Sequence, residues 1–386
     1  MPSQDIHEDF KYFVGSEHIE QRRSQQMEVY PMKISIVDTS PVLAGSTAAE
    51  AYKLTLDLAA QADQLGYSRY WMAELHGVPS NASTSPEIAI AAIASRTSNL
   101  RVGSGAMLFN QRSPYRVAET FVQLNAMFPG RIDLGLGRAT AGPLLDFALQ
   151  SSRQAVATPE PYDDKVVELL HWFDGFEDGH PFAQVPFFDG VAGRPETWIL
   201  GSSPASAVVA ARLGLRYAFA ANLNPGAAHT AMATYRKEFQ PSPFSTGLQS
   251  PYSILGVSVV CGETEEDALR ADAGGEVVRR LAATGRLAPN GVPTTADALD
   301  QLGGLPQPYH YTPGRWPMNI AAAPDRLRDI LQSMAAEVEA DEVIIQDLIA
   351  QPEDRLTSYR LLAESFELRG NRQESISTTT GGTAHV

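Results

Sequence analysis

Residues 100–138, which read LRVGSGAMLFNQRSPYRVAETFVQLNAMFPGRIDLGLGR, decide the fold. The apolar run 100–108 predicts a strand, and after a polar turn Ser113 and Pro114 suit the N-cap and the first position of a helix. Apolar residues recur there at helical spacing up to a Pro-Gly pair, and a second apolar strand covers 132–137. A strand, a helix and a strand in this order form the crossover unit of a parallel sheet. Ligands bind at the C-terminal ends of such strands, where this stretch has glycines and polar residues.

The same alternation of strands and helices runs through most of the chain. The predicted strands are 34–38, 67–74, 100–108, 132–137, 197–201, 217–221, 252–262 and 341–349. Eight strand–helix units predict a (β/α)8 TIM barrel over 32–368, with insertions after the fourth and seventh strands. A doubly wound open sheet is the alternative, but the first strand–helix turn, Asp38-Thr39-Ser40-Pro41, lacks its GxGxxG fingerprint. Residues 1–31 are read as an extension, and 369–386 as a disordered tail.

The composition narrows the functional classes. The chain has 386 residues, 44% of them hydrophobic, and a formal net charge of −15, so nucleic acid and membrane surfaces are poor partners. Cys261 is the one cysteine and is expected to be a buried strand residue. The scattered histidines predict no metal site, and GxSxG and Walker A motifs are missing. No apolar run reaches the roughly 20 residues of a membrane helix, so we expect a soluble, cytoplasmic protein.

The clearest constellation joins Arg138, after the fourth strand, to Gly201-Ser202-Ser203, after the fifth. A helix N-terminus with serine hydroxyls and an arginine fork suits a phosphate group. The alternative is that the serines only cap the helix and that Arg138 pairs with a carboxylate.

Two further strand ends carry candidate residues. Gly105-Ala106 would let a flat ligand approach the backbone, or else would serve a β-bulge or tight barrel packing. Glu74 and His76, two positions apart, would form a proton-transfer pair, or else an ion pair at the barrel rim.

Four segments resemble the bacterial luciferase-like, flavin-dependent monooxygenases, in particular the single-chain members of secondary-metabolite clusters. These segments are LGYSRYWMAELHGVPSNASTSPE (65–87), RTSNLRVGSGAMLFNQRSPYRVAETFVQLNAMFPGRIDLGLGRA (96–139), WILGSSPASAVVAARLGLRYAFAA (198–221) and RLTSYRLLAE (355–364). The resemblance covers about residues 32–366 and implies a TIM barrel that binds reduced FMN at its C-terminal mouth.

The resemblance also implies roles for individual residues. Arg138 would hold the flavin phosphate, and a non-proline cis peptide at Gly105-Ala106 would lie against the isoalloxazine. The FMN-binding residues implied are Gly105, Ala106, Met107, Asn110, Arg138, Gly201, Ser202 and Ser203. Segment 284–319 corresponds to a mobile lid, in which Tyr309, His310, Tyr311 and Trp316 would cover a substrate and exclude water.

The chain departs from the family pattern after its second strand. Relatives have Glu-His-His there, and this chain has Glu74-Leu75-His76; Asn222 also replaces a common histidine. We therefore expect His76, with Glu74, to handle protons. The implied activity is a two-component monooxygenase in which a separate flavin reductase supplies reduced FMN and O₂ gives a C4a-peroxyflavin that oxygenates an organic substrate. The alternatives are a non-catalytic flavin-binding homologue or subunit and a deazaflavin-dependent oxidoreductase. A homodimer is expected from the resemblance.

Overall fold

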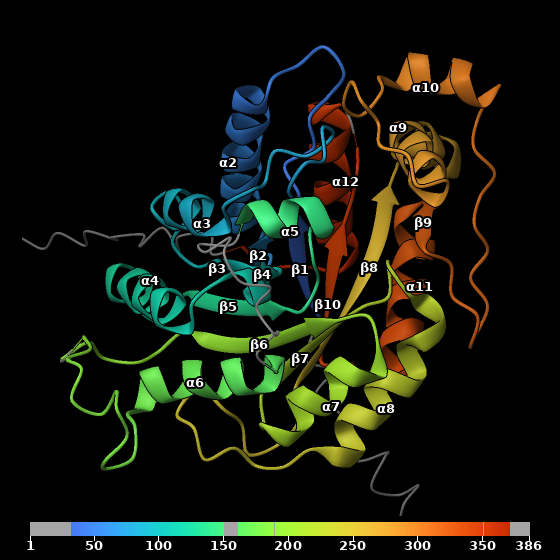
Figure 1. Cartoon of the computed structure of the whole chain (residues 1–386). Helices are drawn as coiled ribbons and strands as arrows, with labels where there is room; N and C mark the ends of the chain where they lie inside the picture. Colours follow the sequence, from blue (N-terminus) through green and yellow to red (C-terminus); the bar gives the residue numbers. More distant parts are fainter. Residues whose placement is uncertain (1–31, 150–160, 189, 350, 371–386) are drawn as a thin grey trace, which may run out of the picture. The chain divides into compact units, whose positions relative to one another are not determined.

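A computed structural model describes residues 32–149, 161–188, 190–349 and 351–370. Eight parallel strands close into a barrel, because the last strand pairs with both the first and the seventh (Figure 1). The barrel strands are β1 (Lys33–Asp38), β2 (Arg69–Met72), β3 (Arg101–Ser104), β5 (Ile132–Gly137), β6 (Glu196–Gly201), β7 (Arg216–Ala220), β8 (Ser253–Cys261) and β10 (Glu342–Gln346). The predicted TIM barrel is confirmed, and the open sheet is excluded.

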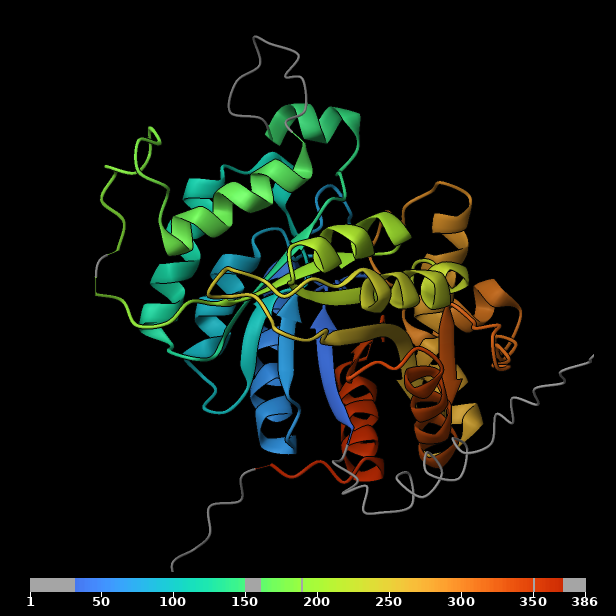
Figure 2. The same cartoon turned by 90° about the horizontal axis from the view of Figure 1, so that it is seen from below.

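Helices follow the strands and cover the outside of the barrel. They include α2 (Ala48–Leu65), α3 (Pro86–Ala94), α4 (Pro114–Met127), α6 (Tyr162–Asp174), α7 (Pro204–Arg212), α8 (Ala228–Glu238), α9 (Glu265–Ala283), α11 (Pro324–Glu337) and α12 (Pro352–Ser365). Helices α2, α12 and α11 pack beside one another (Figure 2). Local sequence fixes where several helices begin: Thr47 with Glu50 forms a capping box on α2, and proline opens α4 and α7.

The third predicted strand is not continuous. It divides into β3 and a short β4 (Met107–Leu108), and the peptide bond between Gly105 and Ala106, which separates them, is cis, as the resemblance implies. A 3₁₀ turn, η1 (Phe109–Gln111), follows. The apolar run does not reveal this break, because hydrophobic periodicity reports burial and not the geometry of a single peptide bond.

Both insertions contain elements that the sequence did not predict. Helix α5 (Pro143–Leu149) lies after β5, and α10 (Thr295–Leu302) and β9 (Asn319–Ala322) lie after β8. Strand β9 pairs in parallel with the C-terminal half of β8, and so extends the sheet beyond the barrel. These elements are short and lie within Pro/Gly-rich sequence, so their hydrophobic periodicity extends over too few residues to predict a helix or a strand. The predicted N-terminal extension and most of the predicted tail lie outside the described residues.

The lower barrel is filled by side chains. At the N-terminal ends of the strands, Arg69 binds Asp133 at 2.7 Å and Glu342 at 3.1 Å. Above this ion cluster, Trp71 and Trp198 meet edge to face with their ring centroids 5.2 Å apart. Because these two layers close the barrel from below, any ligand must enter from the C-terminal side.

Asp38 does not face the mouth, although it ends β1. It is fully buried on the outer side of the sheet, where it accepts a hydrogen bond from Arg355 on α12 at 2.9 Å. Arg355 also donates to Asp347 at 2.8 Å, and Tyr70 and Thr55 donate to the second oxygen of Asp38. This polar network joins the ends of β1 and β10 to α12 and is structural.

Candidate active site

The floor of the mouth is rich in glycine and alanine. Side chains alternate between the two faces of each strand, and most inward positions above the tryptophan layer carry small residues, whereas Leu200 on β6 is a larger one. The small residues are Ala73, Gly105, Ala106, Gly137, Ala220 and Gly256. Most of them remain partly exposed. A flat ring system therefore has room to lie directly on the backbone, above Trp71 and Trp198.

Two of these glycines are also required by packing. A Cβ on Gly105 would lie 2.9 Å from the Cβ of Trp71, and a Cβ on Gly137 would lie 2.9 Å from the Cβ of Ala106. The alternative considered for Gly105, tight barrel packing, is therefore confirmed. The same close packing produces the flat floor, so the two interpretations are compatible.

Amide and hydroxyl groups border this floor. Asn222, after β7, donates to Gln346 at the end of β10 at 2.5 Å. Ser258 on β8 donates to Asn319 at 2.8 Å, and Asn319 donates to the buried Asp272 on α9. These groups are hydrogen-bond donors and acceptors suited to the polar edge of a planar ligand, and none of the side chains named here carries a positive charge.

Arg138 has no carboxylate partner within the described residues. It is exposed at the end of β5, and Asn110 donates to its backbone carbonyl at 2.9 Å. Its charge reaches Tyr162 on α6: burial raises the pKa of Tyr162, and Arg138 opposes that rise. The guanidinium is thus available to an anion.

Helix α7 follows β6, the strand next to β5 in the barrel, since Gly137 pairs with Leu200. The N-terminus of α7 and Arg138 therefore lie at the ends of adjacent strands. Ser203 is the N-cap residue, yet its side chain makes no capping hydrogen bond, and the bond that Ser206 donates goes to the Ser203 carbonyl. Gly201 is required by this turn, because a Cβ there would lie 2.1 Å from the Ser206 hydroxyl. The Ser203 hydroxyl therefore does not cap the helix and has no hydrogen-bond partner among the described residues, whereas Pro204 has no amide hydrogen and the Ser206 amide donates to the Ser203 carbonyl at 3.2 Å.

Glu74 is held in place by several partners. The buried carboxylate accepts the Leu108 amide at 2.8 Å, Arg112 at 2.9 Å and His76 at 2.9 Å. Arg112 also donates to Glu87 at 2.9 Å. Burial lowers the pKa of Arg112, but Glu74 and Glu87 raise it above its usual value. Glu74 and His76 are thus hydrogen-bonded at the rim, a contact that fits both the proton-transfer pair and the ion pair, and one ring nitrogen of the half-buried His76 is not engaged by Glu74.

Lys165 on α6 is a site residue that sequence reasoning missed. Its ammonium donates to the carbonyls of Phe109 at 3.2 Å, Asn110 at 3.0 Å and Arg112 at 2.8 Å. Lys165 therefore fixes the loop that carries Asn110 and Arg112, the arginine that binds Glu74. The available signal was its place on the apolar face of the helix, one turn before Leu169, where a lysine needs a buried partner.

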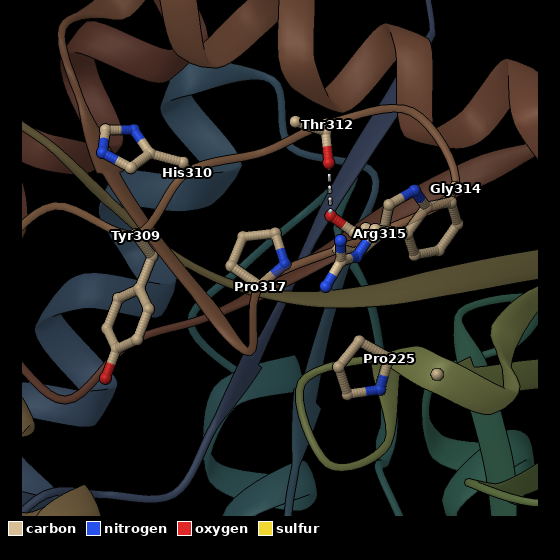
Figure 3. Close-up of a pocket in the computed structure, with 9 residues that line it drawn as sticks. Pro225, Tyr309, His310, Thr312, Gly314, Arg315 and Pro317 are labelled. Carbon is tan, nitrogen blue, oxygen red and sulfur yellow. Dashed lines mark hydrogen bonds between the residues drawn. The ribbon is translucent and has the colours of Figure 1, made fainter.

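The predicted lid residues gather at one side of the rim. Tyr309, His310 and Trp316 line a pocket of about 490 Å³ (Figure 3). Tyr311 instead donates to Glu337 on α11. Met107 lies elsewhere: it is buried and lines a second, smaller pocket together with Arg112. In the described residues, no group of three or more His, Cys, Asp or Glu side chains is arranged to hold a metal ion.

The closed parallel (β/α)8 barrel and its glycine- and alanine-rich mouth, bordered by an exposed arginine and a helix N-terminus, define a TIM barrel with its candidate site at the C-terminal ends of the strands. The luciferase-like monooxygenase family model matches residues 32–346, and the chain belongs to that family. No helix in the described segments is long and apolar enough to cross a membrane.

Relatives match over nearly their whole length. The uncharacterized protein YwcH of Bacillus subtilis is 34% identical over 87% of this chain and 99% of its own. A luciferase-like monooxygenase of Escherichia coli is 33% identical over 86% of this chain and 96% of its own. The crystal structure of apo-MsnO8 has a TM-score of 0.78 and 39% identity, over 88% of this chain and 98% of the other.

Proposed function

We propose that this protein is the oxygenating component of a two-component flavin monooxygenase. It takes reduced FMN from a separate reductase and uses O₂ to oxygenate an organic substrate. The observation that carries this proposal is the pairing of a flat, small-residue floor with a free Arg138 beside the open N-terminus of α7. A planar ring and a phosphate group, joined by a short chain, match these two features.

Named residues would divide the work. Arg138, Ser202 and Ser203 would hold the phosphate, and Gly105 with Ala106 would support the ring. Reduced FMN, when bound, supplies the reaction with O₂ and the transfer of one oxygen atom. The closed lower barrel and the lid residues keep water from the reacting face.

His76 would hold or move a proton at the edge of the mouth. Its Nε2 lies 2.9 Å from Glu74, and that carboxylate is itself fixed by Arg112 and the Leu108 amide. When Nε2 carries the hydrogen of that bond, Nδ1 is left as the proton acceptor. Glu74 is then the orienting group and His76 the catalytic one, while Leu75 contributes no proton chemistry.

Two other functions stay open within this fold. A solved structure of the oxygenating constituent of 3,6-diketocamphane monooxygenase, in complex with FMN, has a TM-score of 0.62 and 17% identity. An F420-dependent secondary alcohol dehydrogenase has a TM-score of 0.54 and 12% identity. These likenesses concern the fold, so a deazaflavin enzyme is the second candidate. A non-catalytic flavin-binding homologue is the third, motivated by Leu75.

Anaerobic titration with reduced FMN, followed by air, tests the proposal. We expect saturable binding, and a long-lived absorbing species before oxidised FMN forms. Arg138→Gln should weaken the binding of reduced FMN by about tenfold or more, because a charge-assisted contact to phosphate contributes roughly 1.5–3 kcal/mol. The affinity for reduced riboflavin, which has no phosphate, should not change. Arg212→Gln, an exposed arginine at the far end of α7, is the matched control.

Contrary results have defined meanings. Binding of reduced F420 in preference to reduced FMN would favour the deazaflavin enzyme. Saturable binding of reduced FMN without slowed reoxidation, and turnover gained only by Leu75→His, would favour the non-catalytic homologue. The expected homodimer is tested separately by light scattering of the full chain.

A further inference from the structure

The lid pocket has a preformed wall. The carboxylate of Glu337, at the end of α11, accepts hydrogen bonds from the Gly314 amide at 2.8 Å and the Trp316 indole at 3.1 Å. Tyr311 donates to it as well, and His229 on α8 lies 3.0 Å away. One carboxylate thus ties the lid segment to two helices. The pocket is a built feature of the rim and does not depend on closure of a loop.

A tight turn fixes the backbone of Arg315 in this wall. Thr312, Pro313, Gly314 and Arg315 form the turn, in which the Arg315 amide donates to the Thr312 carbonyl at 2.9 Å. Proline at the second position and Gly314 with a φ of +74° at the third suit a type II turn. The turn therefore holds Arg315 at a constant place on the rim, and Figure 3 shows its guanidinium between Pro317 and Pro225.

The pocket is cationic in an acidic protein. Arg315 is exposed and makes no ion pair with any residue in the described ranges, and no Asp or Glu lines the pocket. Glu337 and Glu276, the carboxylates that pocket residues contact, already accept hydrogen bonds from Trp316 and Tyr309 respectively. In a chain of net charge −15, an arginine without a counter-ion in a pocket of this kind points to an anionic ligand.

Beyond Arg315, the lining combines prolines and aromatic rings with the polar Thr312 and His310. Pro225, Pro317, Tyr309 and Trp316 line the same pocket as Arg315, and Trp316 is itself supported by the His229 ring, with centroids 4.7 Å apart. Pro225 follows Asn222 of the barrel mouth by three residues, a chain distance of at most about 11 Å. The pocket that contains Arg315 is therefore joined to the border of the mouth by a short stretch of chain.

We propose that this pocket binds the anionic oxyacid group of the organic substrate, with the guanidinium of Arg315 on the anion and the apolar lining on the adjoining carbon skeleton. The inference rests on the proposed function and adds the substrate class, an organic acid with a ring or chain long enough to reach from the lid to the mouth. The flavin phosphate is the other possible source of such an anion, and the experiment separates the two.

Binding of matched acids and amides tests the inference. The probes are 1-naphthoate with 1-naphthamide, and decanoate with decanamide, titrated against the full chain by tryptophan fluorescence. We expect at least one acid to bind about tenfold more tightly than its amide. Arg315→Gln should abolish that preference, and Arg286→Gln, an exposed arginine outside the pocket, should keep it. Equal affinity within both pairs, or a preference that survives Arg315→Gln, would overturn the inference.

Flavin titrations form the second arm. Arg315→Gln should leave the affinities for reduced FMN and reduced riboflavin as they are in the wild type. Loss of FMN affinity alone would show that the pocket holds the flavin phosphate and would overturn the inference. If the wild-type protein binds reduced FMN but does not prefer the acids over their amides, the proposed substrate class is refuted and the proposed monooxygenase function is not. Acid preference without flavin binding refutes the monooxygenase and leaves the pocket standing.

Discussion

Removal of the Arg355 guanidinium should destabilise the barrel by about 4 kcal/mol. Arg355 is 1% exposed and lies between two buried carboxylates, Asp38 at 2.9 Å and Asp347 at 2.8 Å. Arg355→Met keeps much of the volume and leaves both charges without their cation. Breaking a buried pair in this way costs roughly 3–5 kcal/mol. The carboxylates keep other donors, such as Tyr70 and Tyr359, which places the expected loss within that range.

The loss should depend on pH in a defined direction. Burial raises the pKa of Asp38, but Arg355, with Tyr70 and the Ser40 amide, lowers it below its usual value. The stabilisation from this group is therefore full above the unfolded pKa of about 3.9 and is lost as the pH falls. In Arg355→Met, burial acts on Asp38 without its cation, so the folded variant takes up a proton as the pH falls, and the difference between wild type and variant should be largest near pH 7 and shrink toward pH 4.

Urea denaturation followed by circular dichroism at both pH values measures these free energies of unfolding. Arg360→Met on the same helix is the matched control, since the Arg360–Glu364 pair is exposed and contributes less than about 0.5 kcal/mol. Thermal midpoints should differ by roughly 5 °C between the two variants. If Arg355→Met stays within about 1 kcal/mol of Arg360→Met, or its effect grows toward pH 4, the account of this network is refuted.

Three further outcomes are expected. Ala73→Leu should fill the mouth and weaken the binding of reduced FMN at least about tenfold without changing the thermal midpoint of unfolding. Ala283→Leu, on the exposed end of α9, should leave the affinity and the midpoint unchanged. Calorimetric titration measures the affinity. Burial raises the pKa of Asp272 to about 6, with Arg279 opposing, so wild type should gain stability relative to Asp272→Asn as the pH falls from 7 to 4, by about 2 kcal/mol in denaturant titrations. Lys165→Met should lower the free energy of unfolding by about 2 kcal/mol and reduce FMN affinity, whereas Lys237→Met should do neither; unchanged values for Lys165→Met would show that the loop needs no anchor.

Much of the barrel was predictable because its signals are local. Apolar runs and helical spacing placed all eight barrel strands, and proline or capping residues marked where helices begin, as at Pro114 and Thr47. Short elements such as β9 escaped prediction, since four residues in Pro/Gly-rich sequence carry too little periodicity. The break at Gly105 also escaped the pattern, and only the resemblance indicated the cis peptide there.

The candidate site was predictable in part. The ends of adjacent strands bring Arg138 and the start of α7 to one edge of the barrel, as the order of the strands required. The partners of Glu74 were not predictable, because Arg112 and the Leu108 amide come from the loop after the next strand. Lys165 lies still farther along the chain and reaches that loop only in the folded barrel.

The order of strands and helices follows from the sequence, because each element depends on neighbours along the chain. The count of eight strand–helix units indicated the closed barrel, and the motifs indicated the family. The tertiary structure alone decided which polar residues at the strand ends face the mouth. Asp38 ends a strand and Arg138 follows one, yet Asp38 is buried against Arg355, 317 positions away, whereas Arg138 is exposed and has no carboxylate partner in the described part of the chain. Alternation along the strand turns one side chain outward, and only folding brings its distant charge partner to it.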